Sequence, residues 1–153
     1  MKYLQGVTTI QSEQRLTFRF LAYWNRIREG REFPALSDVN IGEIAEMWHH
    51  SFNVDVAAQE NEHSFQYFGP ELVNVFGTDY TNGWVKEALE DAPMLANTIG
   101  FYPRVLDSRA PVSESSSFYL EGREVKYRSL IVPLSSDGEQ IDYLFGTTNY
   151  KVY

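Results

Sequence analysis

The sequence predicts an α+β protein in which a long and a short helix precede two strands, several short helices and three further strands. Apolar side chains recur at helical spacing between residues 16 and 27, which predicts the first helix. Two short runs, 49–58 and 64–69, alternate apolar with polar residues as half-buried strands do. From residue 111 onward the chain is strand-like, and its 153 residues suit one domain with a sizeable core.

The first helix is predicted over residues 12–29. Its apolar face carries four residues spaced by four, four and three positions, namely Leu16, Phe20, Trp24 and Ile27. Gly30 is a natural stop, and Asp38 or Asn40 can cap a second short helix over residues 41–48. We expect the apolar face to cover a sheet, either that of its own chain or that of a partner in a homodimer.

The remaining elements are predicted from the alternation of apolar and polar residues, and from the prolines and glycines that end helices and strands. Alternating Phe65 and Tyr67 on the second run would share one face, and the two runs can pair as a hairpin. Residues 84–107 form two or three broken helical pieces, because prolines and Gly100 interrupt them. Turn residues at 121–122 and 135–138 then separate three strands of an antiparallel meander.

Charge is unevenly distributed along a chain of net charge −8. Residues 32–92 hold twelve acidic residues against one lysine, a net charge of −11, whereas residues 13–31 hold five arginines against two glutamates. The acidic middle disfavours nucleic acid as a partner. The arginines are expected to form a solvated helix face, or to meet an acidic partner or the acidic middle of the same chain.

The sequence predicts no membrane contact. No apolar run approaches the roughly 20 residues that cross a bilayer. The first residues also lack the apolar block and the cleavage site of a secretory signal. We therefore expect an unprocessed, cytoplasmic protein.

Catalytic and metal-binding motifs are absent from the sequence. Without cysteine there is no disulfide, thiolate nucleophile or iron–sulfur cluster. Neither a G-x-S-x-G nucleophile turn nor a glycine-rich phosphate loop occurs. His49 and His50 would point to opposite faces of a strand, so polar surface or core histidines are favoured over a site shared with Glu46 or His63. We expect no metal site and no enzymatic activity.

The order of elements resembles a PAS domain, in which two strands, short helices and three strands form a five-stranded antiparallel sheet. FQYFGPELVNVFGTD, residues 65–79, looks like the second strand running into the first short helix, and residues 122–146 look like the last hairpin. The preceding segment is similar to that of small stand-alone bacterial PAS proteins through Tyr23-Trp24, Arg26, Arg28, Gly30, Pro34, Asp38-Val39, Ile41 and Ile44. By this resemblance, residues 1–40 are an N-terminal helix and loop, and residues 41–153 are a PAS-like domain in the same compact unit.

The resemblance implies a sensory or regulatory protein that binds a small molecule, a protein partner or both, and that signals in trans. A pocket between the sheet and the longest helix would be lined from the sheet by Phe65, Tyr67, Tyr119, Tyr127, Leu130 and Phe145. From the helices it would be lined by Trp84, Leu95, Ile99 and Tyr102, with Arg104 or Asn97 orienting a polar group. A packed aromatic core is the plainer interpretation of the same residues.

No cofactor follows from the sequence. In PAS domains haem is usually held by a histidine of the long helix, and residues 84–109 contain none, which counts against haem. Covalent flavin photochemistry is excluded because the chain has no cysteine.

Two other classes of protein stay open. A cone-shaped α+β enzyme or carrier with an aromatic pocket would need a buried carboxylate. Asp55 and Asp142 fall at strand positions but alternate with apolar neighbours, so both are expected to face outward. A protein-interaction adaptor would instead have a filled core and no ligand. In a sensor, the signal would be a shift between two packings of the N-terminal helix on the sheet.

Overall fold

A computed structural model describes residues 10–153 of the chain, with side chains from Leu16 onward. Within that range one antiparallel sheet has the strand order β2-β1-β5-β4-β3. Its strands are β1 (Ser51–Asp55), β2 (Ser64–Phe68), β3 (Val112–Leu120), β4 (Arg123–Leu134) and β5 (Tyr143–Val152). The predicted five-stranded antiparallel sheet behind an N-terminal helix is therefore confirmed.

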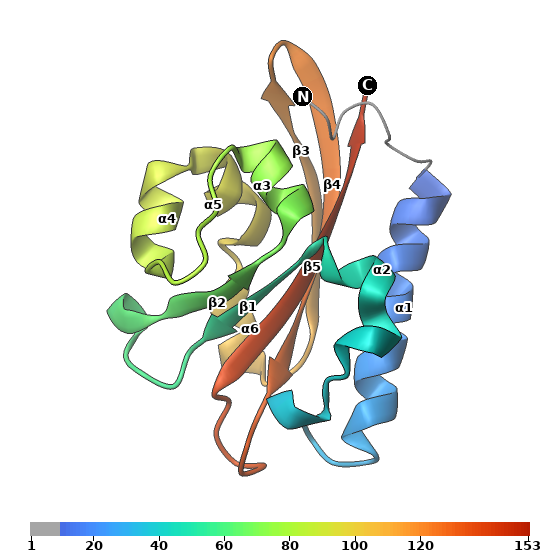
Figure 1. Cartoon of the computed structure of the whole chain (residues 1–153), viewed down its shortest axis with the longest axis vertical. Helices are drawn as coiled ribbons and strands as arrows, with labels where there is room; N and C mark the ends of the chain where they lie inside the picture. The colour runs from blue at the N-terminus through green and yellow to red at the C-terminus, as the bar shows by residue number, and fades with distance from the viewer. Residues whose placement is uncertain (1–9) are drawn as a thin grey trace.

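Helices cover the two faces of the sheet (Figure 1). We call one the outer face; it is covered by α1 (Ile10–Arg28) and α2 (Ala45–Trp48). The other, the inner face, is covered by α3 (Pro70–Phe76), α4 (Val85–Asp91), α5 (Pro93–Ile99) and α6 (Tyr102–Ser108). The division of the chain at residue 40 stays a prediction, and residues 1–9 of its first part lie outside the described residues.

The first helix and its connection agree with the sequence signals. After α1, Glu29 and Gly30 both have positive φ, at 51° and 79°, which turns the chain away from the helix axis. The 3-10 turns η2 (Leu36–Asp38) and η3 (Ile41–Ile44) lead into α2. The side chain of Asn40 accepts a hydrogen bond from the Gly42 backbone N–H, as expected for a cap.

A bulge in β2 changes which of its side chains share a face. Tyr67 lies opposite Asn53, but Phe65 lies opposite the next residue, Val54, so Gln66 is an extra residue on this strand. Phe65 and Phe68 consequently both point to the inner face, and Tyr67 points to the outer face. The expected shared face of Phe65 and Tyr67 is wrong, because simple alternation takes no account of an inserted residue.

The helices and turns of the second half end or begin at the prolines and glycines that predicted them. The segment 84–107 contains three pieces, α4, α5 and α6, with Pro93 in the first turn of α5 and a break at Gly100. Glu121 and Gly122, with φ of 54° and 77°, form the two-residue turn between β3 and β4. β5 continues past Gly146 to Val152, so the last hairpin is longer than the predicted 122–146.

The centre of the sheet is buried on both faces. Every residue of β5 from Leu144 to Tyr150 is buried, because α1 covers one side of this strand and the rings of Phe52 and Phe76 pack against the other. Gly146 faces Phe52 so closely that a Cβ at this position would lie 2.2 Å from a ring carbon. The ring of Phe52 thus packs directly against the backbone of β5 at Gly146.

Candidate functional site

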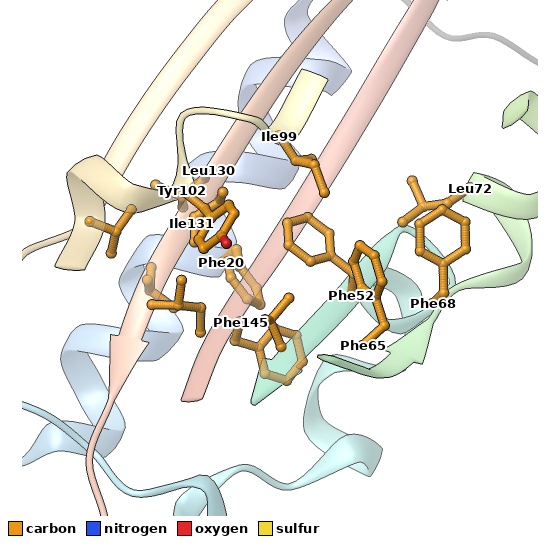
Figure 2. Packing of buried hydrophobic residues seen from close by; sticks show 14 of the residues in the cluster. Phe20, Phe52, Phe65, Phe68, Leu72, Ile99, Tyr102, Leu130, Ile131 and Phe145 are labelled. Carbon is orange, nitrogen blue, oxygen red and sulfur yellow. The ribbon is translucent and has the colours of Figure 1, made fainter. Parts of the chain in front are cut away.

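The inner face is filled by aromatic rings that contact one another. Ring pairs connect Phe52, Phe65, Phe68 and Phe76, and Phe76 in turn contacts Phe118 and Tyr150, with centroid separations from 5.4 to 6.5 Å. Figure 2 shows Phe52, Phe65 and Phe68 gathered on the side of α3, which contributes Leu72. Tyr127 joins the network through Phe118, so that each strand supplies at least one ring. These contacts favour the packed-core interpretation of the aromatic residues.

Some of the hydroxyl groups on this face have hydrogen-bond partners within the fold. Tyr127 donates to the backbone carbonyl of Asn97 at 2.7 Å. Ser129 and Thr148, opposite each other on β4 and β5, are fully buried and share a hydrogen bond of 2.9 Å. The hydroxyls of Tyr127, Ser129 and Thr148 therefore need no water, since protein atoms satisfy them.

Five of the twelve predicted pocket residues are buried on the inner side of the sheet. They belong to the hydrophobic core, and they are Phe65, Leu95, Ile99, Tyr102 and Tyr127. Whether any of them touches a ligand stays a prediction.

Three other predicted pocket residues lie on the outer face. Phe145 packs against Phe20 of α1, with ring centroids 5.1 Å apart. Leu130 alternates with the inward-facing Ile131, the residue opposite Gly146, so it also faces outward. Tyr67 points to the outer face because of the bulge at Gln66. The expectation that these residues line an inner pocket is wrong, since strand alternation from sequence does not reveal which face is which.

The remaining four predicted pocket residues reach solvent. Trp84 is 47% exposed and Tyr119 on the edge strand β3 is 70% exposed. Arg104 forms an ion pair with Glu114, and the Asn97 side chain is exposed while only its carbonyl binds Tyr127. Both polar candidates are thereby directed away from the core.

The most specific polar contact beneath the helices joins His63 to Tyr102. His63 precedes β2, Tyr102 begins α6, and the two residues meet through Nδ1 and the phenolic oxygen at 3.0 Å. Burial lowers the pKa of His63, although a hydrogen bond to the Ala58 backbone and nearby Glu60 oppose the shift. Burial, aided by the negative charge of Glu60, raises the pKa of Tyr102 to about 12. Both shifts favour the neutral forms, so a neutral imidazole and a neutral phenol share this hydrogen bond, with the donor set by the His63 tautomer.

His63 also connects two elements, the 3-10 turn η4 (Glu60–Glu62) and α4, through its backbone. Its carbonyl accepts from the N–H of Val85 at the start of α4, and its own N–H donates to Glu60 of η4. Together with the ring contact to Tyr102, these bonds fix η4, α4 and α6 around one residue. An open cleft of about 620 Å³ lies between the same elements, with Tyr102 in its wall.

The four predicted interface residues of α1 cover the sheet of their own chain. Phe20 and Trp24 are buried, and Leu16 and Ile27 pack against the same cluster. The Trp24 indole N–H donates to the carbonyl of Pro133 in β4 at 2.8 Å. Only about 10 Å³ of space is left in one gap between this helix and the sheet, which is room for about one water molecule.

Two arginines of α1 meet the acidic middle of the same chain. Arg19 pairs with Glu46 and Arg26 pairs with Glu43, both at 2.8 Å, so α1 is joined to the segment η3–α2. Arg31 pairs with Asp38 in the following loop. Each exposed pair contributes little to stability, roughly 0 to 1 kcal/mol, but together they fix how α1 sits beside α2. For Arg19 and Arg26, the acidic partners therefore lie in the middle of the same chain.

Strand β2 carries contacts on both faces of the sheet. On its outer side, Tyr67 stacks on Trp48 of α2 with ring centroids 3.9 Å apart, and its hydroxyl donates to the Trp48 carbonyl. Trp48 also contacts Phe145, the residue against which Phe20 of α1 packs. A continuous set of contacts therefore runs from Tyr102 and His63, along β2, to α1.

Sequence reasoning did not single out the two connecting residues of this set. His63 was one of three histidines without a motif, and only its position directly before an alternating run hinted at burial. Trp48, at the end of a short helix, has no periodic signal. Among the described residues no group of three or more acidic or histidine side chains could hold a metal ion.

Known proteins share this architecture, as a family model and two solved structures show. A family model described as PAS domain matches residues 12–149. The PAS domain of BvgS from Bordetella pertussis is similar with a TM-score of 0.50 and 16% sequence identity, over 72% of this chain and 86% of that chain. A cysteine-to-serine mutant of the fungal photoreceptor Vivid also aligns, with a TM-score of 0.50 and 15% identity, over 84% of this chain and 97% of that chain. At such identities the likeness concerns the fold. No curated protein matches the chain.

Within residues 10–153, no helix combines the length and apolar character needed to span a bilayer. The cone-shaped fold considered above is not the one observed, because the sheet order and the helix placement are those of a PAS domain.

Proposed function

Because this chain belongs to the PAS domain family, we propose that it is a sensory domain that signals in trans through the solvent-facing side of α1. In this proposal the domain carries out no chemical reaction. A change in the region of the cleft alters how α1 packs on the sheet, and a separate protein reads that change.

The observation that carries the proposal is the continuous contact between the cleft and α1. Rotation or withdrawal of Tyr102 would release His63, which anchors the start of β2. Movement of β2 would in turn act on Trp48 through the Tyr67 stack. Because packed side chains adopt discrete arrangements, such a shift is expected to favour one of two positions of α1 over the other.

The solvent-facing side of α1 offers a contact for a partner. Phe18 is 72% exposed and lies on the helix face opposite Phe20, where Arg19 is already paired with Glu46. An exposed aromatic side chain on a helix that is otherwise anchored by its own sheet is a common kind of anchor in protein interfaces. A homodimer that uses this side chain is one form of the proposal, and a different protein is the other.

Site-specific photo-crosslinking tests this role for α1. A benzophenone amino acid replaces Phe18 in one variant and Tyr119 in a matched control, since both are aromatic and about equally exposed, at 72% and 70%. In cells of the natural host, irradiation is expected to give one discrete adduct at position 18 and not at position 119. An adduct of twice the 17.7 kDa mass of the chain would identify the homodimer. Equal labelling at both positions, or none at position 18, would refute the role of α1.

A ligand-free adaptor differs from this sensor only in having nothing to bind in the cleft. It would use the same α1 contact, so the crosslinking result is shared by both. Ligand binding separates the two.

A further inference from the structure

The cleft between η4, α4 and the α5–α6 junction has the size of a small-molecule site. Its volume of about 620 Å³ falls within the range of roughly 300 to 1,000 Å³ that is usual for ligand pockets. It lies outside the aromatic core and is walled by elements that His63 holds together. A molecule in this cleft would touch Tyr102 directly.

We propose that this cleft binds a small organic amine, with Glu60 and Glu90 receiving its ammonium group and Leu89 packing against its apolar stem. The inference deepens the proposed sensory function and depends on it for its biological meaning. It names the class of ligand and the residues that recognise it.

The charges in the cleft favour a cation. Two acidic residues, Glu60 and Glu90, lie in its lining together with one cationic residue, Lys86. In the part of the chain that the structure describes, none of the three takes part in an ion pair, whereas Arg19, Arg26, Arg31, Arg104 and Arg109 all do. The surrounding segment 32–92 has a net charge of −11, which adds a negative potential. Two free carboxylates in a concave, acidic surface are suited to a cationic ligand.

The other lining residues favour an organic cation over a metal ion. Leu89, Pro103 and the wall formed by Tyr102 supply apolar surface, which a hydrated metal ion would not use. No group of three metal-ligating side chains occurs among residues 16–153. Lys86 and the amides of Gln59 and Asn61 can donate to an acceptor elsewhere on the same ligand. An amino acid has this combination of an ammonium, an apolar stem and a carboxylate.

Glu60 places the proposed ammonium site next to the buried residues His63 and Tyr102. Its negative charge acts on both His63 and Tyr102, as the causes of their shifted pKa values indicate. A cation bound at Glu60 would neutralise that charge and change the electrostatic balance at the Tyr102 hydroxyl. Binding in the cleft would thus reach the first residue of the contacts that lead to α1.

Titration of the isotope-labelled full chain with three probes of one carbon skeleton tests the ligand class. The probes are leucine, isopentylamine, which lacks the carboxylate, and 4-methylpentanoate, which lacks the amine. We expect leucine and isopentylamine to shift backbone amide signals of residues 59–62 and 86–90 in a saturable way. 4-Methylpentanoate is expected to leave them unchanged, because it offers no ammonium to the two carboxylates.

Variants locate the binding site. Glu60→Gln combined with Glu90→Gln is expected to weaken isopentylamine binding at least about tenfold, because each charged hydrogen bond is lost. Glu62→Gln is the matched control, since it lies on the same turn η4 but outside the cleft lining, and it should change binding less than about twofold at moderate salt. Equal binding of 4-methylpentanoate, no binding of either amine, or full binding by the double variant would overturn the inference.

Hydrogen exchange in α1, measured with and without the amine, separates this inference from the proposed function. Amine binding that leaves hydrogen exchange in α1 unchanged would keep the cleft as an amine site and refute its coupling to α1. Coupling of the Tyr102 region to α1 without any amine binding would keep the sensory mechanism and refute the ligand class.

Discussion

Gly146→Ala is expected to destabilise the fold because the new methyl group would collide with the ring of Phe52. A Cβ at this position would lie 2.2, 2.4 and 2.8 Å from three carbons of that ring. Phe52 is fully buried and itself contacts Phe65, so it has little room to move aside. The collision lies at the middle of the inner face, beside the central strand β5.

The magnitude follows from two opposing effects. Overpacking of a tight core costs about 1 to 3 kcal/mol. Replacing glycine by alanine lowers the entropy of the unfolded chain, which offsets about 0.4 to 1 kcal/mol where the backbone suits alanine. Gly146 has no positive φ, so this gain applies. With the middle of each range, the net expected loss in the free energy of unfolding is about 1.3 kcal/mol.

Urea denaturation followed by tryptophan fluorescence measures this loss, and a double-mutant cycle assigns it to the ring. In a Phe52→Leu background the same Gly146→Ala change should cost at least about 0.5 kcal/mol less, because the two positions are in contact. If Gly146→Ala has no effect, or the same effect in both backgrounds, the ring does not occupy the space beside β5. The packed-core interpretation would then be refuted.

Two further perturbations test other parts of the structure. Trp24→Phe removes the donor to the buried Pro133 carbonyl and should lower the free energy of unfolding by about 1 to 2 kcal/mol in urea melts; an unchanged stability would mean that this bond does not hold α1. Acidification should destabilise the fold because burial lowers the pKa of His50 and His63 below the ordinary value of 6.5. Their contribution is complete above pH 6.5 and is lost as the pH falls below it, since the unfolded chain then binds more protons, by up to about 1.4 kcal/mol per pH unit for each histidine. His63→Gln should flatten this dependence in melts at several pH values, and an unchanged slope would contradict the burial of a neutral ring.

The sequence was sufficient for the order of elements and for the buried face of α1, but it left open whether that face covers the sheet of the same chain or of a partner. The stripe from Leu16 to Ile27 has a single period, and a helix with such a stripe must bury it somewhere. Turn residues at Gly122 and Gly138 adopt the positive φ that their positions suggested. Local patterns of this kind depend on neighbours in sequence, so they can be read without the fold.

The sequence could not predict in the same way which face of the sheet a strand residue points to, or which residue it pairs with. The bulge at Gln66 reverses the side on which Tyr67 lies, and only the pairing with β1 reveals it. Leu130 and Phe145 are as apolar as core residues of the inner face, and their strands are buried on both sides, so alternation carries no signal there. The contact between His63 and Tyr102 spans 39 residues of sequence, and no motif announces it.

The central claim is that the Tyr102–His63 contact is coupled to the packing of α1. Hydrogen exchange measured by mass spectrometry over residues 16–28 tests it most directly, in Tyr102→Phe and in the matched control Tyr127→Phe. Each change removes one buried hydroxyl and keeps the ring, but only Tyr102 bonds to His63, whereas Tyr127 bonds to the Asn97 carbonyl. The account predicts faster exchange in α1 for Tyr102→Phe than for Tyr127→Phe. Equal exchange in the two variants, or exchange unchanged from the parent protein, would contradict it.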